Sequence, residues 1–161
     1  MTMNRTLPAT ALLALALSGC AAPHPGRAVA APPCPARRSP VRDSGGFRGM
    51  FTLVPGTPVV ASSCAYAGMN DRRHDYGRLI RGHALRGRIV RALQGELNRE
   101  GRWPGGTYDC PADDGAAHLL LFRYADGGVT RVSVGDGGCR SATNGQRTVR
   151  APGDYPGRYG G

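Results

Sequence analysis

Lysine is absent from this chain of 161 residues: all 21 basic residues are arginine, against 11 acidic residues, which gives a formal net charge of +10. The chain also lacks the hydrolase signatures G-x-S-x-G and H-E-x-x-H. Its five cysteines show no C-x-x-C spacing, which argues against a zinc site. No apolar run reaches the roughly 20 residues that a membrane-spanning helix needs. The length suits one modest domain.

With 25 glycines and 13 prolines, the composition is typical of a GC-rich genome, because Arg, Gly, Pro and Ala have GC-rich codons. Part of the arginine excess therefore reflects codon usage. A basic exported protein is nevertheless drawn to anionic lipid head groups. Nucleic acid is the usual partner of such a charge, but the signs of export described next make it a poor candidate here.

Residues 1–19 have the layout of a secretory signal peptide. A short polar start with one positive charge at Arg5 is followed by an apolar stretch from Leu7 to Leu17 and by the small residues Ser18 and Gly19. This apolar stretch is too short to span a bilayer. The segment is therefore expected to be removed and to take no part in the fold.

Leu17-Ser18-Gly19-Cys20 resembles the bacterial lipobox, a Leu followed by two small residues and a Cys. The resemblance implies that the Cys20 sulfur carries a diacylglyceryl group and becomes the first residue of the mature chain, with ordinary secretion as the alternative. Two or more acyl chains hold a protein stably on a membrane. We therefore expect a lipid-anchored protein on the outer, extracytoplasmic face of the cell membrane. The mature chain loses Arg5, and its net charge is 20 − 11 = +9.

Composition divides the mature chain into three parts. Residues 20–49 are rich in Pro, Ala, Gly and Arg and are expected to form a flexible tether. Since Pro-rich chains extend by about 3.1 Å per residue, this tether could reach several nanometres. Residues 50–145 form the predicted domain, and residues 146–161 lack periodicity and are expected to be disordered.

The predicted domain is α+β, with one amphipathic helix packed on a small, disulfide-stapled antiparallel sheet. Short strands are expected at 50–54 and 57–66, and a polar loop at 67–78. The helix is expected at 83–100, where an apolar stripe recurs every four residues: Leu85, Ile89, Leu93 and Leu97.

A hairpin of residues 118–124 and 128–134 is the strongest structural signal, because Asp126-Gly127 separates two apolar runs. A two-residue turn there pairs Leu121 with Val132 and Leu119 with Val134. The face carrying these four residues is assigned to the helix. The opposite face is expected to be covered by the N-terminal strands, or left partly open for binding.

If Cys20 is lipidated, four cysteines remain, which in an exported small domain implies two disulfides with three possible pairings. Cys110 and Cys139 both lie just outside the hairpin, so we predict the Cys110–Cys139 bond. The Cys34–Cys64 bond follows by elimination.

No cofactor or metal site is predicted. Asp109, Asp113, Asp114 and Asp136 lack the spacing of a calcium loop, and Asp is also a turn residue. His74-Asp75 and His118 suggest no catalytic arrangement in sequence. The remaining candidate is a surface for anionic lipid or an acidic wall polymer, formed by arginines within 20 consecutive residues: Arg72, Arg73, Arg78, Arg81, Arg86, Arg88 and Arg91.

The series YDCPADDG, ADGG, GGC and TNG is similar to a pattern in uncharacterised secreted proteins and lipoproteins of high-GC Gram-positive bacteria. That resemblance implies export and paired cysteines, and no activity. The sequence therefore predicts a membrane-anchored, non-catalytic binding module, with a small cell-envelope hydrolase as the alternative and the oligomeric state left open.

Overall fold

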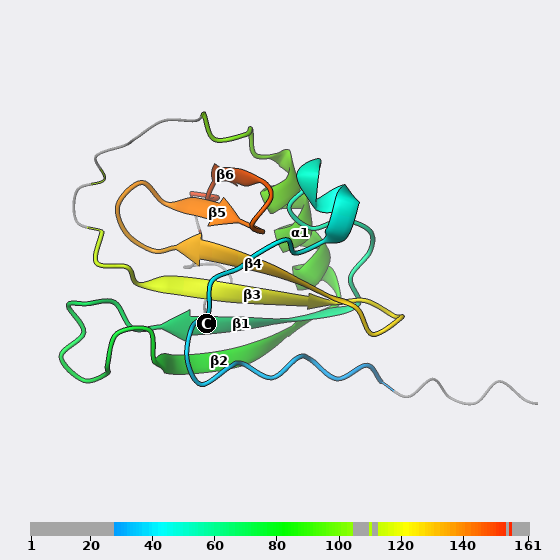
Figure 1. Cartoon of the computed structure of the whole chain (residues 1–161). Helices are drawn as coiled ribbons and strands as arrows, with labels where there is room; N and C mark the ends of the chain where they lie inside the picture. The colour runs from blue at the N-terminus through cyan, green and yellow to red at the C-terminus, as the bar shows by residue number, and fades with distance from the viewer. Residues whose placement is uncertain (1–27, 105–109, 111–112, 154, 156–161) are drawn as a thin grey trace, which may run out of the picture.

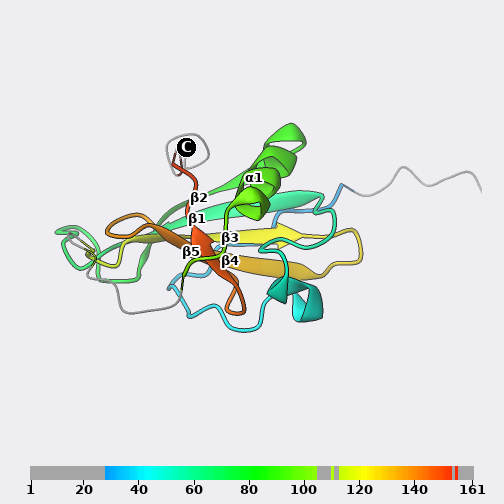
Figure 2. The same ribbon diagram turned by 90° about the horizontal axis from the view of Figure 1, so that it is seen from above.

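The computed structural model describes residues 28–104, 110, 113–153 and 155. It contains one six-stranded antiparallel sheet, with a helix on one face and the N-terminal segment on the other (Figures 1 and 2). The fold is α+β, as the sequence predicts. Its elements in chain order are η1 (Gly46–Met50), β1 (Val60–Tyr66), β2 (Leu79–Arg86), α1 (Arg88–Arg99), β3 (Ala117–Arg123), β4 (Val129–Gly135), β5 (Ser141–Thr143) and β6 (Thr148–Arg150).

The strand order is β2-β1-β3-β4-β5-β6. Strands β3 to β6 follow one another as neighbours, whereas β2 and α1 are inserted between β1 and β3 in the chain. Strand β1 is buried along its whole length, because β2 and β3 flank it and both faces of the sheet are covered. Strands β2 and β6 form the two edges.

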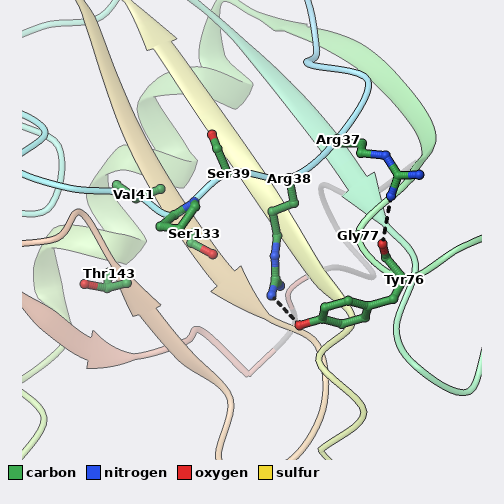
Figure 3. Close-up of a pocket in the computed structure, with 9 residues that line it drawn as sticks. Arg37, Arg38, Ser39, Val41, Tyr76, Gly77, Ser133 and Thr143 are labelled. Carbon is green, nitrogen blue, oxygen red and sulfur yellow. Dashed lines mark hydrogen bonds between the residues drawn. The ribbon is translucent and has the colours of Figure 1, made fainter.

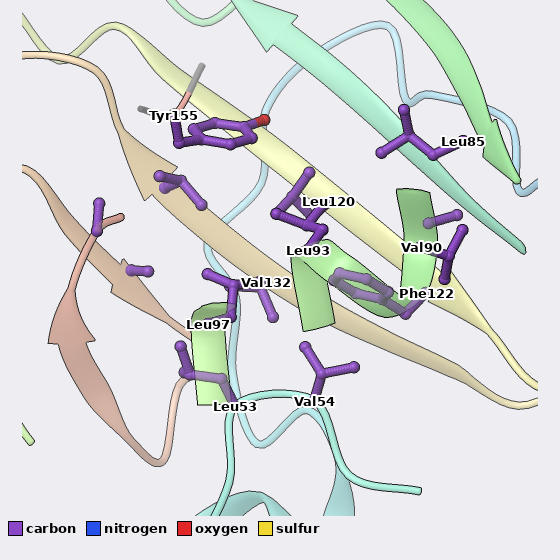
Figure 4. Close-up of a cluster of buried hydrophobic side chains, with 14 of the residues drawn as sticks. Leu53, Val54, Leu85, Val90, Leu93, Leu97, Leu120, Phe122, Val132 and Tyr155 are labelled. Atoms are coloured by element: carbon purple, nitrogen blue, oxygen red, sulfur yellow. The ribbon is translucent and has the colours of Figure 1, made fainter. Parts of the chain in front are cut away.

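Helix α1 buries Val90, Leu93 and Leu97, spaced three and four residues apart, against the sheet (Figure 4). The prediction that the helix begins at His83 is wrong, since residues 83–86 belong to β2. Gly87, with a φ of 58°, separates the strand from the helix, and only glycine adopts that region without strain. The face below the helix carries four large side chains: Leu120, Phe122, Val132 and Val134.

The hairpin of β3 and β4 is confirmed, but its predicted register is wrong by one residue. The Tyr124 N–H donates to the Gly128 carbonyl (3.0 Å), which leaves a three-residue loop, and Gly127 has a φ of 88°. Leu120, not Leu121, therefore faces Val132. A slip of one residue exchanges the two faces of a strand, so Leu119 and Leu121 lie on the face opposite the helix.

Residues 28–49 are not a free tether, because they fold along that opposite face. Cys34 is bonded to Cys64, and the Ser62 and Tyr66 hydroxyls donate to the carbonyls of Pro32 and Pro35. The segment covers a second buried cluster: Cys64, Tyr66, Leu119 and Leu121. The prediction that the N-terminal side of the chain covers this face is confirmed, but the covering segment precedes the predicted strands.

Residues 50–54 do not form the predicted strand. They follow the 3-10 helix η1 and are held by the fully buried Asn144, whose side-chain amide donates to the carbonyls of Gly49 (2.9 Å) and Leu53 (3.2 Å). Strand β1 begins at Val60, three residues later than predicted.

The expectation of disorder from residue 146 is wrong for residues 146–153. Residues 148–150 pair with β5 as β6, and Tyr155 is buried in the core. Residues 154 and 156–161 lie outside the described residues. Both predicted disulfides, Cys34–Cys64 and Cys110–Cys139, are confirmed.

Candidate functional site

The seven arginines of the predicted anionic surface are all exposed, but they do not form one patch. Arg72, Arg73 and Arg78 belong to the loop before β2. Arg86, Arg88 and Arg91 lie at the far end of that strand and on α1, and Arg81 lies between the two groups. An eight-residue strand is about 23 Å long, so the sheet edge separates two basic groups.

Within the described part of the chain, none of these seven arginines forms an ion pair with a carboxylate. The Arg86 guanidinium donates instead to the Val29 carbonyl (3.4 Å). Their charges are therefore left for solvent or for an anionic partner. Arginine suits such a role, because its planar fork matches carboxylate and phosphate oxygens.

A hollow of about 470 Å³ lies at the loop end of the sheet, on the face opposite the helix (Figure 3). Arg37 and Arg38 of the N-terminal segment form one wall. The Arg38 guanidinium donates to the Gly115 carbonyl (2.9 Å) and to the Tyr76 hydroxyl (3.1 Å), which fixes its position. Arg37 pairs with Asp75 (3.4 Å), and both of these side chains are largely exposed.

Two hydroxyl groups in this hollow have no hydrogen-bond partner among the described residues. They belong to Ser39 of the N-terminal segment and Ser133 of β4. The Ser133 hydroxyl points toward Arg38 across the hollow (Figure 3). The Thr143 hydroxyl, by contrast, donates to the Arg147 carbonyl (3.0 Å). The hollow therefore combines two cations with two free hydroxyls, which suits an anionic, hydroxyl-bearing ligand.

Sequence reasoning missed this hollow because it assigned Arg37 and Arg38 to the tether. The predicted Cys34–Cys64 bond was a sign against this assignment, because Cys34 lies only three residues before Arg37 and the bond holds it to the domain. A second hollow of about 360 Å³, lined by Ala36, Arg37, Arg78 and Leu79, adjoins the first at Arg37. Arg78 of the predicted surface lines this second hollow together with Arg37, which also lines the first.

His74 and Asp75 are neighbours in the sequence, but each forms its ion pair with a different residue. His74 Nδ1 lies 3.2 Å from Asp71 Oδ2, and Asp75 pairs with Arg37. Backbone N–H donation from Arg73, followed by the contacts with His74, lowers the pKa of the partly exposed Asp71 carboxyl. These contacts shape the loop that carries Tyr76.

A buried polar chain joins three strands on the helix side of the sheet. Asp136 Oδ2 lies 3.1 Å from His118 Nε2, and His118 Nδ1 lies 3.4 Å from Ser63 Oγ. The Ser63 hydroxyl also contacts the Tyr155 hydroxyl (3.1 Å). Sequence reasoning considered His118 and Asp136 separately, but it could not place them beside Ser63.

Tyr155 packs over the His118 and Ser63 end of these contacts, whereas the Asp136 side chain is 25% exposed. The Tyr155 ring packs edge-on against the His118 ring at 5.1 Å, and Ser63 is only 1% exposed. Burial raises the pKa of the Tyr155 hydroxyl, so this group stays neutral. An acid–imidazole–hydroxyl chain is the arrangement that activates a serine nucleophile, but here the Ser63 and His118 side chains are buried and Tyr155 contacts both.

Of the aspartates considered for calcium, Asp136 contacts His118, and two others serve turns. Asp113 and Asp114 each accept a backbone N–H two residues ahead (2.9 Å), whereas Asp109 lies outside the described residues. Over the described ranges, no three His, Cys, Asp or Glu side chains gather closely enough to hold a metal ion.

Cys20 and residues 1–19, the predicted signal peptide, lie outside the described residues. In the part that is described, no helix has both the length and the apolar character needed to cross a membrane. Comparisons with protein-family models, curated proteins and solved structures find no match.

Proposed function

We propose that this protein is a lipid-anchored, extracytoplasmic and non-catalytic binding module that takes an anionic ligand in the hollow beside Arg38. The observation that carries the proposal is the combination of a positioned guanidinium with the unpartnered Ser39 and Ser133 hydroxyls. The volume of about 470 Å³ lies within the usual range for small-molecule sites.

The ligand class follows from this lining. Arg38 supplies a fixed positive charge, and Arg37 and Arg78 extend it toward the sheet edge. The free hydroxyls each offer one donor and two acceptor positions. An acidic sugar unit, carrying either a carboxylate or a phosphate ester, matches both features, whether it is free or part of an acidic wall polymer.

Titration of the full, oxidised chain with three probes tests the site: glucuronate, glucose 1-phosphate and neutral glucose. We expect saturable changes in the amide NMR signals of Ser39, Tyr76 and Ser133 with one or both anions and none with glucose. The comparison of the two anions identifies the charged group.

Ser133→Leu should weaken anion binding about tenfold or more, because it removes a hydroxyl and fills the hollow. Thr57→Ala is the matched control, since Thr57 is an exposed hydroxyl residue away from the hollow. Equal affinity in both variants, or glucose binding as tightly as the anions, would refute the assignment.

The anchor is tested separately. The mature protein should carry acyl groups on Cys20 by mass spectrometry, and Cys20→Ala should leave the membrane fraction. An unmodified Cys20 in a protein that still sediments with membranes would disprove the anchor.

A hydrolase remains the second candidate, and the Asp136–His118–Ser63 chain is what favours it. In that reading His118 takes the Ser63 proton as Oγ attacks an acyl carbon, and returns it to the leaving group. A fluorophosphonate probe should then label Tyr155→Ala but not Tyr155→Ala/Ser63→Ala. If a folded Tyr155→Ala variant is not labelled, the hydrolase hypothesis fails and the contacts among Asp136, His118 and Ser63 have only a structural role.

A further inference from the structure

One end of the sheet gathers the points where four strands begin or end. Val60 pairs with both Arg86 and Arg123, and Arg123 pairs with Val129. The described chain also starts here, because the Arg86 guanidinium reaches the Val29 carbonyl. In Figure 1 the first described residues and the β3–β4 turn lie at the same end of the sheet. We call this region the exit end; the hollow beside Arg38 lies at the opposite end.

The exit end exposes apolar side chains that the core does not use. Ile89 is 48% exposed, Val59 41% and Val129 39%. The Val59 N–H donates to the Arg123 carbonyl (2.9 Å) on one side of β3, and Val129 pairs with Arg123 on the other side, so β3 lies between the two valines at this end of the sheet. Ile89 is the second residue of α1 and lies three residues after Arg86, the last residue of β2, so all three apolar residues belong to the same end.

Positive charge surrounds these apolar residues. Arg86 and Arg88 are exposed, and Arg123 lies between Val59 and Val129. Asp126, whose carboxylate accepts the Gly128 N–H within the turn, is the carboxylate nearest in sequence to Val129. Apolar residues ringed by arginine are typical of surfaces that lie on anionic membranes.

The chain between the anchor and the domain is short. Cys20 and Ala28, the first described residue, are separated by eight peptide units, which span at most about 29 Å when fully extended. The first described residue thus stays within about 3 nm of the anchor, and the end nearest to residue 28 is the end held closest to the bilayer.

We propose that the exit end docks on an anionic lipid bilayer, with Ile89, Val59 and Val129 entering the head-group region and Arg86 and Arg88 contacting lipid phosphates. This orientation rests on the proposed anchor at Cys20. It directs the hollow beside Arg38 away from the membrane, toward ligands in the surrounding space.

Another exposed apolar pair provides the comparison. Phe47 and Phe51 of the η1 region are 73% and 63% exposed and contact each other edge to face. Both side chains are larger than those of the exit end, but they belong to η1 and its C-cap and not to the ends of the paired strands. If the membrane instead contacts this pair, the domain sits in a different orientation.

The experiment uses the lipidated full chain on vesicles of phosphatidylglycerol or of phosphatidylcholine. The chain has one tryptophan, Trp103, so a Trp103→Phe background allows a single reporter at Val129→Trp or, in a second protein, Phe47→Trp. Brominated lipids quench a tryptophan that enters the bilayer. We expect quenching and a blue shift at position 129 on phosphatidylglycerol, with little change at position 47 or on phosphatidylcholine.

A second measurement uses charge introduction within the apolar group. Val59→Asp/Val129→Asp should abolish the quenching of a reporter at Ile89→Trp, whereas Phe47→Asp/Phe51→Asp should leave it unchanged. Circular dichroism establishes that each variant is folded. Quenching at position 47 alone, or equal quenching at both positions, would overturn the proposed orientation.

The docked orientation, the anchor and the ligand site can each fail in a distinguishable way. An acylated Cys20 without quenching at position 129 refutes the docked orientation and leaves the anchor intact. Cys20 without acyl groups refutes the anchor and, with it, the orientation. Ligand titration of the hollow is independent of both results.

Discussion

Gly82 lies directly against the Cys34 side chain: a Cβ built on Gly82 falls 2.5 Å from Cys34 Sγ. The approach exists because Gly82 pairs with Cys64 across β1 and β2, and Cys64 is bonded to Cys34. A residue with any side chain at position 82 would therefore push the N-terminal segment off the sheet.

Gly82→Ala should lower the free energy of unfolding by about 1–3 kcal/mol, the usual cost of overpacking. Urea denaturation of the oxidised protein measures the change. Gly101→Ala is the matched control, because a Cβ there meets no heavy atom within 4 Å. If the two variants unfold alike, the close approach at Gly82 has no energetic consequence.

Asn144→Asp should destabilise the domain by several kcal/mol at neutral pH. The Asn144 amide donates to three carbonyls, those of Gly49, Thr52 and Leu53, and an ionised carboxylate in its place would face those oxygens with no proton to share. Asn70→Asp, an exposed position, gives the background effect of the same change. A thermal unfolding midpoint that is equal in both variants would contradict the role given to Asn144.

Stability should fall above about pH 10 because of Tyr155. Burial raises the pKa of its hydroxyl above the unfolded value near 10, with Asp136 adding to the shift and the Ser63 contact opposing it. A raised folded pKa gives a stabilising contribution that is complete below the unfolded pKa and is lost as the pH rises toward the folded one.

Tyr155→Phe should flatten this alkaline decline while lowering stability by about 1 kcal/mol at pH 7, through loss of the contact with Ser63. Unfolding free energies measured from pH 8 to pH 12 on both proteins decide the matter. An unchanged slope in Tyr155→Phe would assign the decline to other groups.

The two disulfides should contribute unequally even though they close loops of nearly equal length, with sequence separations of 30 and 29. Loop entropy alone predicts about 3.6 kcal/mol for each. The Cys34–Cys64 bond also holds the segment that covers Leu119 and Leu121, so its loss exposes that cluster as well. Cys34→Ala/Cys64→Ala should therefore be less stable than Cys110→Ala/Cys139→Ala, as measured by urea unfolding.

The sequence predicted those features that depend on short-range chemistry. The apolar runs on either side of Asp126-Gly127 placed the hairpin correctly, and Leu93 and Leu97 of the predicted stripe lie on the buried face of α1. The other two members of the stripe do not, since Leu85 belongs to β2 and Ile89 is exposed. What it could not supply was the loop length. One extra residue between Tyr124 and Gly128 exchanged the two faces of β3 while β4 kept its predicted faces, and a turn dipeptide does not fix that number.

Other errors came from contacts between distant segments. Proline-rich residues 28–49 are too poor in apolar side chains to fold alone, yet Cys64, Tyr66 and Ser62 hold them to the sheet. The segment 148–150 lacks periodicity and becomes a strand because β5 offers it an edge. The Ser63–His118–Asp136 chain likewise exists only once three separate strands are aligned.

The insertion of β2 and α1 between β1 and β3 divides the domain into two halves that neither disulfide joins. Cys34–Cys64 closes the first half, which ends with α1 at Arg99, and Cys110–Cys139 closes the second, which begins before β3. In the chain, residues 100–109 connect the two halves. A single proteolytic cut there would yield two oxidised fragments held together by the β1–β3 seam, the helix contacts and the polar chain at Ser63, so the domain is built as a pair suited to fragment complementation.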